Sequence, residues 1–295
     1  MTRRQEKLFR SLGIALVLML LALCAQMIVS GTTFASDRVV VWVFDVGQGD
    51  AIFIDAPQAQ ILIDGGGNSD VLQKLTRVMP FWDRHIDLLV NTHPHADHVT
   101  GMVHVLDRYE VGEVWTSGQG YGTDIYDAFE SFASPPFEGG ARGGYRAVQS
   151  GDTFDLGLGA TLRVLWPNES ASGRLENPHD ANVTMLLTYG ETTILLTGDM
   201  EGEVEAQLLD DVGHIDVLKV GHHGSLTSTT SELLEDTTPD YAVISVGSEN
   251  DYGHPHPVVL DRLETFGVQV LRTDVDHDVR ITTDGGEPSL TLFDL

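Results

Sequence analysis

The sequence contains little cysteine and little positive charge. Its 295 residues include one cysteine, Cys24, and 17 lysine and arginine residues against 44 aspartate and glutamate residues. With one cysteine the chain cannot form an internal disulfide, and beyond residue 24 it offers no thiolate as a metal ligand. Any metal ion held by the rest of the chain must therefore be bound through nitrogen and oxygen atoms.

The excess of acidic residues gives a formal net charge of −27 at pH 7, and only Lys7, Lys74 and Lys219 are lysines. A surface this acidic repels a polyanion unless metal ions or salt screen it. Simple solubility is one interpretation. We favour a halophilic protein, because an acidic surface is tolerated and stays hydrated in high salt.

The first 36 residues have the layout of an export signal. A basic segment, TRRQEKLFR, precedes the apolar run LGIALVLMLLALCAQMIV and the small, polar segment SGTTFAS. This layout predicts a signal peptide cleaved near Ala35, or an uncleaved membrane anchor, because the apolar run just reaches the ~20 residues that cross a bilayer. Either way residues 37–295 are expected outside the cytoplasm, free or anchored to the outer face of the cytoplasmic membrane.

The rest of the chain alternates strands and helices. Short apolar runs bounded by Gly, Pro or Asp predict strands at residues 38–46, 51–56, 59–64, 86–92, 111–117, 160–167, 182–190, 192–199, 215–224, 240–247 and 268–273. Helical spacing predicts helices at residues 69–79, 97–109, 200–212, 229–237 and 256–267. A Pro/Gly-rich loop at 134–144 separates the two halves. This order predicts an α/β domain over residues 37–295, with two sheets packed together and helices outside.

Four metal-ligating side chains lie within six positions of the stretch VNTHPHADHVTGM, residues 90–102. His93 and His95 alternate in an extended segment after a predicted strand, so both can point the same way. Asp97 and His98 begin the next predicted helix and can serve a second metal ion. Histidine with carboxylate suits zinc, and also manganese or iron when oxygen ligands share the site. The cluster therefore predicts a metal site.

Further polar side chains follow later strands. Asp199, in LLTGDM, is either a helix N-cap or a ligand, and its two oxygens allow both roles. His222 and His223, in LKVGHHGS, are flanked by glycines that let the backbone approach a ligand closely. His254, in YGHPHP, fits a proline-stiffened turn as well as it fits a substrate contact.

Three other residues carry weaker signals. Asp50 lies in the glycine-rich turn FDVGQGDA, whose pattern alone indicates an ordinary hairpin. Asp64, at the end of LID in LIDGGG, is expected to orient the histidine loop from behind the ligands. His179, in ENPHDANV, precedes Asp199 by 20 residues and is a moderate candidate.

Taken in order, these motifs resemble the metallo-β-lactamase superfamily. More narrowly, FDVGQGDAIFI, LIDGGG, NTHPHADHVTGM, LLTGDME, DVLKVGHHGSLTST and YGHPHP are similar to the hydrolase domain of ComEC-type DNA-uptake (competence) proteins and their free-standing relatives. The similarity runs from about residue 39 to about residue 273. It implies an αββα sandwich of two mixed β-sheets flanked by helices, with two divalent metal ions at one edge, most readily zinc, with manganese as the alternative.

The resemblance also implies roles for individual residues. Ligands of the first metal would be His93, His95 and His179. Ligands of the second would be Asp97, His98 and His223, with Asp199 bridging the two ions. The implied catalytic residues are Asp97, His222 and His254. The implied substrate-binding residues are Asp50, His222 and His254. The roles of His222 and His223 are open to exchange.

The reaction that this arrangement predicts is metal-assisted hydrolysis. Two metal ions held ~3.5–4 Å apart can share a hydroxide, generate it at neutral pH and stabilise a developing oxyanion. The expected substrate is a phosphodiester, either extracellular nucleic acid such as DNA or a phosphorylated surface polymer. In molar salt the Debye length shrinks to ~3 Å, which weakens the repulsion between an acidic protein and DNA.

Three other functions stay open at this point. A lactonase or thioesterase on the same fold would favour an apolar pocket. A non-catalytic exported module could keep a metal for stability, although every ligand position carried over is occupied. An accessory subunit of a separate membrane channel protein is compatible with activity, because one apolar segment at most cannot conduct DNA by itself.

Overall fold

The computed structural model describes residues 37–134, 144–169, 177–209 and 212–295, together with residues 5, 13–14 and 16–19 near the N-terminus. The chain divides into two units, residues 1–36 and residues 37–295. Among the described residues, no helix is both long and apolar enough to cross a membrane. The predicted export signal falls mostly outside the described residues, as do residues 135–143 of the predicted Pro/Gly loop.

Within residues 37–295 the described strands form two mixed sheets. The first has eight strands in the order β15-β14-β1-β2-β3-β4-β5-β6, of which β3 to β6 run parallel to one another. Its strands are β1 (Val39–Val43), β2 (Ile52–Asp55), β3 (Gln60–Ile63), β4 (His85–Asn91), β5 (Glu110–Thr116), β6 (Gly144–Ala147), β14 (Asp278–Thr283) and β15 (Ser289–Phe293).

The second sheet has seven strands in the order β13-β12-β11-β10-β9-β8-β7, with β10 to β13 parallel. Its strands are β7 (Thr153–Gly157), β8 (Ala160–Trp166), β9 (Thr184–Tyr189), β10 (Thr192–Leu196), β11 (Val217–Lys219), β12 (Tyr241–Ile244) and β13 (Gln269–Arg272). The described helices are α2 (Asp70–Val78), α3 (Ala96–Leu106), α4 (Asp124–Ala133), α5 (Gly202–Leu208), α6 (Ser231–Thr237), α7 (Pro257–Thr265) and α8 (Thr273–Asp276).

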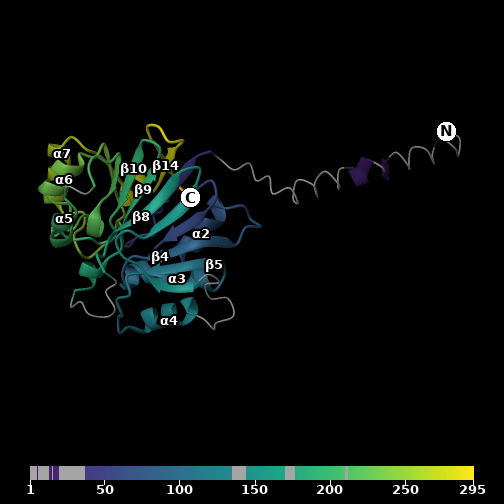
Figure 1. Cartoon of the computed structure of the whole chain (residues 1–295), viewed down its shortest axis with the longest axis horizontal. Helices are drawn as coiled ribbons and strands as arrows, with labels where there is room; N and C mark the ends of the chain where they lie inside the picture. The colour runs from purple at the N-terminus through teal and green to yellow at the C-terminus, as the bar shows by residue number, and fades with distance from the viewer. Residues whose placement is uncertain are drawn as a thin grey trace. The chain divides into compact units, whose positions relative to one another are not determined.

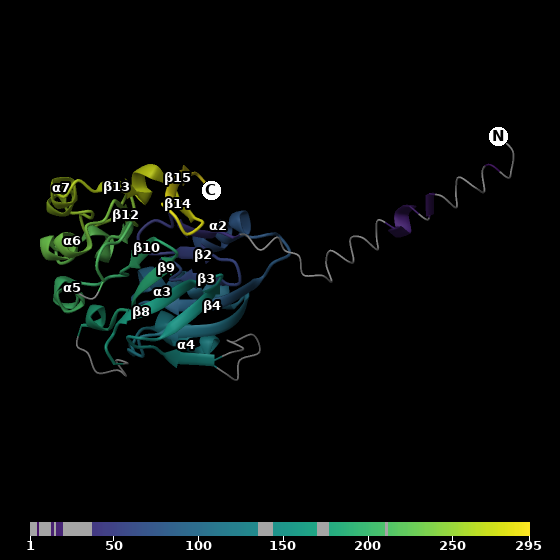
Figure 2. The same cartoon turned by 45° about the horizontal axis from the view of Figure 1, so that its top comes forward.

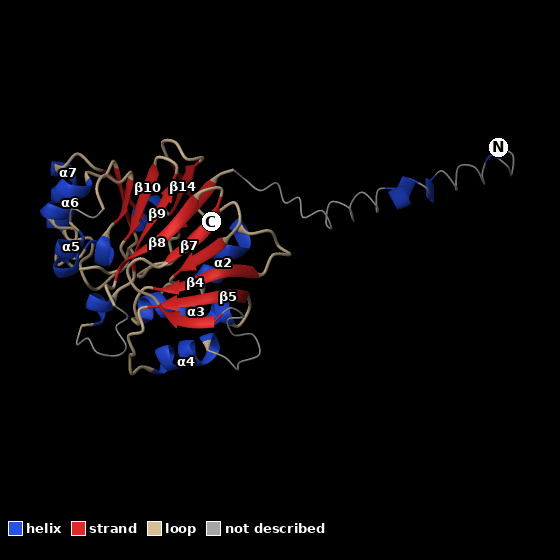
Figure 3. Ribbon diagram, viewed as in Figure 1, coloured by secondary structure: helices blue, strands red, loops and turns tan. Residues whose placement is uncertain are grey.

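The two sheets pack face to face, and helices cover their outer faces (Figures 1 and 3). The cluster between the sheets draws alternate residues from both, among them Val41, Ile54, Val90, Leu162, Met185 and Ile194. One outer cluster packs α2, α3 and α4 on the first sheet, and another packs α5, α6 and α7 on the second. The prediction of an αββα sandwich with two mixed sheets flanked by helices is therefore confirmed.

Side chains alternate between the two faces of each strand, so one sheet packs against the other sheet on one face and against helices on the other. In β1 the side chains of Val39, Val41 and Val43 are buried between the sheets, whereas Trp42 faces the other way and packs against the outer cluster. Each fully buried aliphatic side chain of this kind contributes about 1.5–3 kcal/mol relative to an exposed one. The two faces of each strand therefore fix the order of the layers.

The structure contains elements that the sequence patterns did not predict. Strands β14 and β15 near the C-terminus return to the first sheet, where β14 pairs antiparallel with β1 (Figure 2). The strand predicted at 215–224 is limited to β11, because the chain turns sharply at His222 and His223. Asp199 is not a helix N-cap, since α5 begins at Gly202 with Glu201 in the N-cap position.

Two glycines let α3 lie directly against the loop that follows β3. A Cβ on Gly101 would lie only 1.8 Å from the Gly65 carbonyl oxygen and 2.8 Å from that of Asn68. The backbone N–H of Gly65 also donates to the His98 carbonyl over 2.8 Å. This contact brings the first turn of α3 next to Asp64, which becomes important for the site.

We predict that Gly101→Ala lowers the free energy of unfolding by at least about 1–3 kcal/mol. Backbone atoms occupy the space of the new methyl group, and they cannot rotate away from it. Urea denaturation followed by circular dichroism measures this change. Gly122→Ala is the matched control, since a Cβ at Gly122 meets no atom within 4 Å. Equal stability of the two variants would contradict the close approach.

Candidate metal centre

The histidine cluster occupies the connection between β4 and α3. β4 ends at Asn91 and α3 begins at Ala96, with His95 in the N-cap position. The side-chain amide of Asn91 donates to the His93 carbonyl over 2.7 Å and holds the connection at the end of the strand. His93 is fully buried, whereas His95 lines an open cavity.

Asp199 comes from the other sheet and lies at the centre of the site. It follows the end of β10 by three residues, and its side chain is 2 % exposed. Its backbone N–H donates to the side-chain oxygen of Asn182 over 2.9 Å. Gly198 precedes it with a φ of 53°, and a Cβ there would lie 2.3 Å from the same oxygen. Asn182 and Gly198 together fix the direction in which the carboxylate points.

The two carboxylate oxygens of Asp199 face two different groups of histidines. The first group surrounds Oδ2, with Nε2 of His93 at 3.6 Å, Nε2 of His222 at 3.6 Å and Nδ1 of His179 at 3.9 Å. The second group surrounds Oδ1, with Nε2 of His98 at 3.4 Å and Nε2 of His223 at 3.5 Å. One carboxylate therefore separates two sets of nitrogen donors.

Each group is completed by a residue of the histidine cluster. In the first, Nδ1 of His95 lies 3.1 Å from Nε2 of His93, and both lie with His179 in a set whose ligand atoms are within 4.8 Å of one another. In the second, an oxygen of Asp97 lies 3.4 Å from Nε2 of His223 and 3.9 Å from that of His98. The structure thus brings together all seven residues proposed as metal ligands from the sequence.

Asp64 determines which ring nitrogens of His93 and His98 carry no proton in the neutral imidazole. Its Oδ2 lies 2.8 Å from Nδ1 of His98, so that the neutral imidazole carries its proton there and turns an unprotonated Nε2 to Asp199. The same oxygen accepts the hydroxyl proton of Thr92 over 2.6 Å. That hydroxyl must then accept from Nδ1 of His93, 3.1 Å away, which leaves Nε2 of His93 unprotonated as well.

His222 and His223 lie in a strained turn after β11. Their φ angles are 47° and 55°, in the left-handed region that non-glycine residues rarely adopt. Such strain persists where the surrounding structure enforces it, and it is concentrated at functional sites. Gly221 permits the turn, because a Cβ there would lie 2.7 Å from the carbonyl oxygen of Met200.

An ion pair lies directly behind His223. Lys219 Nζ lies 2.9 Å from Oδ2 of Asp50, and both side chains are 1 % exposed. The other Asp50 oxygen is 3.5 Å from Nδ1 of His223, which donates to the Ser245 carbonyl over 2.9 Å. The role of Asp50 expected from the sequence therefore needs correction. Asp50 is buried against Lys219 behind a candidate ligand and does not face a substrate.

Four buried atoms of the candidate ligands have no hydrogen-bond partner: Nε2 of His98, Nδ1 of His179, Oδ1 of Asp199 and Nε2 of His223. A buried polar atom left unpaired costs about 1–3 kcal/mol. Imidazole nitrogen and carboxylate oxygen are the donors that zinc and manganese take in proteins. The residues present therefore fit two divalent metal ions, one on each side of Asp199.

Burial and neighbouring charges shift the pKa values of these groups in opposite directions. Burial by itself raises the pKa of Asp199, but His223, His98 and His93 outweigh it and hold that pKa well below its usual range. Burial lowers the pKa of His93 and takes that of His179 to about 4. Burial also lowers the pKa values of His98 and His223, but Asp199 and the other nearby carboxylates outweigh it and raise both. At neutral pH the site thus presents an ionised Asp199, and metal ions binding there would displace protons from His98 and His223.

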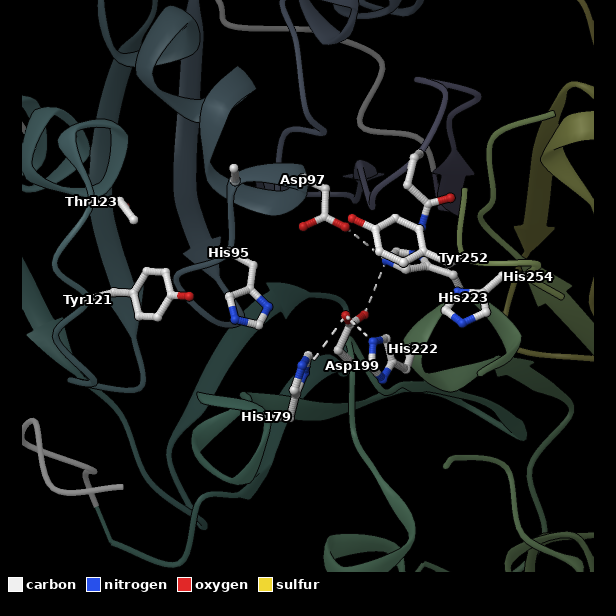
Figure 4. A pocket seen from close by; sticks show the side chains of 12 residues that line it. His95, Asp97, Tyr121, Thr123, His179, Asp199, His222, His223, Tyr252 and His254 are labelled. Atoms are coloured by element: carbon white, nitrogen blue, oxygen red, sulfur yellow. Dashed lines mark ion pairs between the residues drawn. The ribbon is translucent and has the colours of Figure 1, made fainter. Parts of the chain in front are cut away.

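A cavity of about 410 Å³ opens over Asp199. Figure 4 shows Tyr121 and His95 on one side of this carboxylate and Tyr252 and His254 on the other. His254 Nδ1 is buried without a hydrogen-bond partner. Burial, and next the nearby His222, lower the pKa of His254, so its imidazole is neutral at pH 7.

Sequence reasoning missed several residues that build this site. Lys219 interrupts an apolar run, and a lysine at the end of a buried strand was a signal for a buried ion pair. Tyr252 lies two positions before His254, and Tyr121 lies in a glycine-rich loop. No pattern in the sequence marks Asn182, whose role depends on a contact with a residue 17 positions away.

Comparison with known families agrees with this geometry. The model of the metallo-beta-lactamase superfamily matches residues 44–248, which is more than half of the chain. The chain belongs to the metallo-beta-lactamase superfamily. Membership makes it a hydrolase of that fold, and superfamily members typically bind divalent metals at His and Asp clusters of this kind.

Among curated proteins, this superfamily member is similar to Competence protein ComA of Neisseria gonorrhoeae, with 28 % identity over 81 % of this chain and 31 % of that protein. It is 30 % identical to ComE operon protein 3 of Bacillus subtilis over 256 residues, covering 80 % of this chain and 32 % of that protein. It is 31 % identical to Recombination protein 2 of Haemophilus influenzae, covering 80 % of this chain and 28 % of that protein. The chain thus spans about a third of the length of these relatives.

Solved structures show the same fold at low sequence identity. YhfI of Bacillus subtilis, a metallo-beta-lactamase fold protein, aligns with a TM-score of 0.53 and 13 % identity over 80 % of this chain and 96 % of that chain. The CmlA beta-hydroxylase E377D mutant aligns with a TM-score of 0.53 and 15 % identity over 83 % of this chain and 53 % of that chain. At these identities the likeness concerns the fold alone.

We predict that Asp64→Asn weakens metal binding by about 10- to 100-fold in the half of the site that contains His98. The amide keeps an oxygen for the Thr92 backbone N–H but places its NH₂ group against Nδ1 of His98. The histidine must then carry its proton on Nε2, where the metal would bind. Metal content after dialysis, measured by atomic emission, is expected to fall from two equivalents per chain to about one.

Asp216→Asn is the matched control for this experiment. Oδ2 of Asp216 accepts from the Thr193 backbone N–H and hydroxyl over 2.7 Å and 3.1 Å, much as Asp64 does with Thr92, but it is in none of the ion pairs of the candidate metal ligands. The control should keep two equivalents. If Asp64→Asn also kept two equivalents at unchanged affinity, Asp64 would not orient His98.

Proposed function

We propose that the chain is a metal-dependent phosphodiesterase that hydrolyses nucleic acid through two divalent metal ions. The observation that carries the proposal is the position of Asp199, whose two oxygens face separate sets of nitrogen donors. A single-ion site needs one such set. Two sets of donors on either side of one carboxylate could hold two ions, which when bound would stabilise both the attacking and the leaving oxygen of an in-line displacement at phosphorus.

Two sets of residues of this chain would each hold one ion. The first ion would be held by His93, His95, His179 and Oδ2 of Asp199. The second would be held by Asp97, His98, His223 and Oδ1 of Asp199. When bound, zinc or manganese ions would lower the pKa of water and neutralise negative charge on the phosphoester.

His222 and His254 are proposed to orient the phosphate above the ions. Nδ1 of His222 lies 3.2 Å from Oε1 of Glu201, which holds the ring so that Nε2 points to Asp199. The rings of His222 and His254 are 5.7 Å apart and both line the cavity. A neutral His254 can donate a hydrogen bond from one ring nitrogen and accept a proton at the other.

The relatives support a substrate that is a nucleic acid. The names of two of them refer to recombination and to competence, and both processes involve DNA. Because the chain spans only about a third of these proteins, a DNA substrate and a separate membrane channel partner are proposals for this chain. The acidic surface supports action in high salt, where screening permits DNA to approach.

The composition of residues 1–36 supports action outside the cytoplasm. A basic segment followed by an apolar run and small residues is the layout of a secretory signal or an anchor. We therefore propose that residues 37–295 face the outside, either released or attached to the membrane through the N-terminal segment.

A lactonase or thioesterase on the same fold is the second candidate function. Such an enzyme would favour an apolar pocket. Most residues that line the cavity over Asp199 instead carry polar groups, including Gln48, Asp97, Thr123 and several histidines. This lining supports a charged phosphoester over an apolar ester.

We predict that the purified chain, assayed at high salt with zinc or manganese, hydrolyses bis(4-nitrophenyl) phosphate and single-stranded DNA but not a lactone. His95→Ala should lower kcat on both phosphodiesters by about 100-fold or more, because it removes a ligand of the first ion. A chelator should abolish the activity, and added metal should restore it.

His85→Ala is the control, because His85 is an exposed histidine at the opposite end of the same strand β4. It should leave kcat unchanged. Phosphodiesterase activity that survives His95→Ala would refute the two-ion assignment. Hydrolysis of the lactone alone would favour the second candidate function.

A further inference from the structure

We propose that Tyr252 determines substrate specificity by stacking on an unpaired nucleobase next to the phosphodiester to be cut. This inference rests on the phosphodiesterase function proposed above and names a recognition element that the metal centre does not provide. Three observations support it: the exposure of the ring, the rigidity of its loop, and its position beside the candidate phosphate-binding histidines.

The ring of Tyr252 is exposed at the edge of the cavity. The residue is 71 % exposed although its side chain is large and mostly apolar. One face lies against His254, with ring centroids 5.7 Å apart and an interplanar angle of 24°. The stack leaves the other face of the tyrosine open to solvent, so an aromatic base can extend it.

The loop that carries Tyr252 is held in place by Asn250. The side-chain NH₂ group of Asn250 donates to the carbonyl oxygens of Gly247 and His254, over 2.8 Å in each case. Its side-chain oxygen accepts from the His254 backbone N–H over 2.9 Å. Because one side chain satisfies three backbone groups around the loop, the tyrosine is presented without a large ordering cost on binding.

A row of three rings connects Tyr252 with the metal ligands. Tyr252 stacks on His254, the ring of His254 is 5.7 Å from that of His222, and Nε2 of His222 is 3.6 Å from Asp199. Figure 4 shows this row on one side of the Asp199 carboxylate. A phosphate held by His222 and His254 would therefore place its neighbouring base beside Tyr252.

The cavity lining has few positively charged groups for a phosphate backbone, so base stacking becomes a larger part of nucleic-acid binding. Among its described lining residues there is no lysine or arginine. Proteins that bind single strands usually combine a basic groove with aromatic stacking, and each stacked base contributes even without sequence preference. Here base stacking would add affinity that no basic side chain of this lining supplies, beside the phosphate contacts of His222 and His254. Stacking also requires an open base face, which a double helix does not offer.

The test compares two fluorescently labelled strands of equal length, an oligothymidylate and an abasic deoxyribose phosphate strand. Both carry the same phosphates, so they differ only in the bases. Tyr252→Ala in the metal-loaded full chain is expected to raise KM for the oligothymidylate by about 5- to 100-fold. KM for the abasic strand, kcat and metal content should change by less than twofold. Tyr252→Phe should behave as the wild type.

Phe81→Ala is the matched control, because Phe81 is an aromatic residue 82 % exposed just before the N-terminal end of β4, away from the cavity. It should leave both KM values unchanged. Equal increases in KM for both strands, or no increase for either, would overturn the role of Tyr252. If the wild type cut neither strand nor bis(4-nitrophenyl) phosphate, the phosphodiesterase proposal itself would fail.

Discussion

Negative charge gathered where the two sheets meet is the constraint on which the rest of the site depends. The carboxylates of Asp50, Asp64, Asp97 and Asp199 lie around one set of histidines, and all but Asp97 are at most 2 % exposed. Lys219 neutralises one of them. Thr92 and His98 hydrogen-bond Asp64, and Asp97 is partly exposed. A buried charge without a partner costs several kcal/mol, so Asp199 in particular needs positive charge beside it. Two divalent ions would supply that charge, and the unpaired nitrogen atoms would supply the remaining ligands.

The fold meets this constraint by bringing strand ends from different sheets to one place. The first sheet delivers Asp64 and the histidine cluster after β3 and β4, and the second delivers Asp199 and His223 after β10 and β11. The close contact between Gly65 and Gly101 sets α3 against the β3 loop, so that Asp64 reaches His98. Residues behind the ligands therefore fix their direction before any ion binds.

The sequence predicted the parts of the site whose residues lie close together in the chain. The spacing of His93, His95, Asp97 and His98 predicted a metal site, because strand and helix geometry determine where neighbouring side chains point. The layered fold followed from the order of strands and helices together with the family resemblance.

Long-range features could not be predicted in this way. The alternating patterns VRITT and SLTLF, at β14 and β15, fit strands, but the pairing of β14 with β1 joins residues more than 200 positions apart. The burial of Asp50 depends on Lys219, which comes from the other sheet. Which oxygen of Asp199 each histidine faces is likewise a property of the packed structure. Contacts between distant parts of the chain set all three.

The most direct test of the central claim is anomalous diffraction at the zinc edge from crystals of the zinc-loaded protein. The account predicts two anomalous peaks on opposite sides of the Asp199 carboxylate, one beside His93 and His95 and the other beside His98 and His223. A single peak, or two peaks of which one lies away from Asp199, would contradict it.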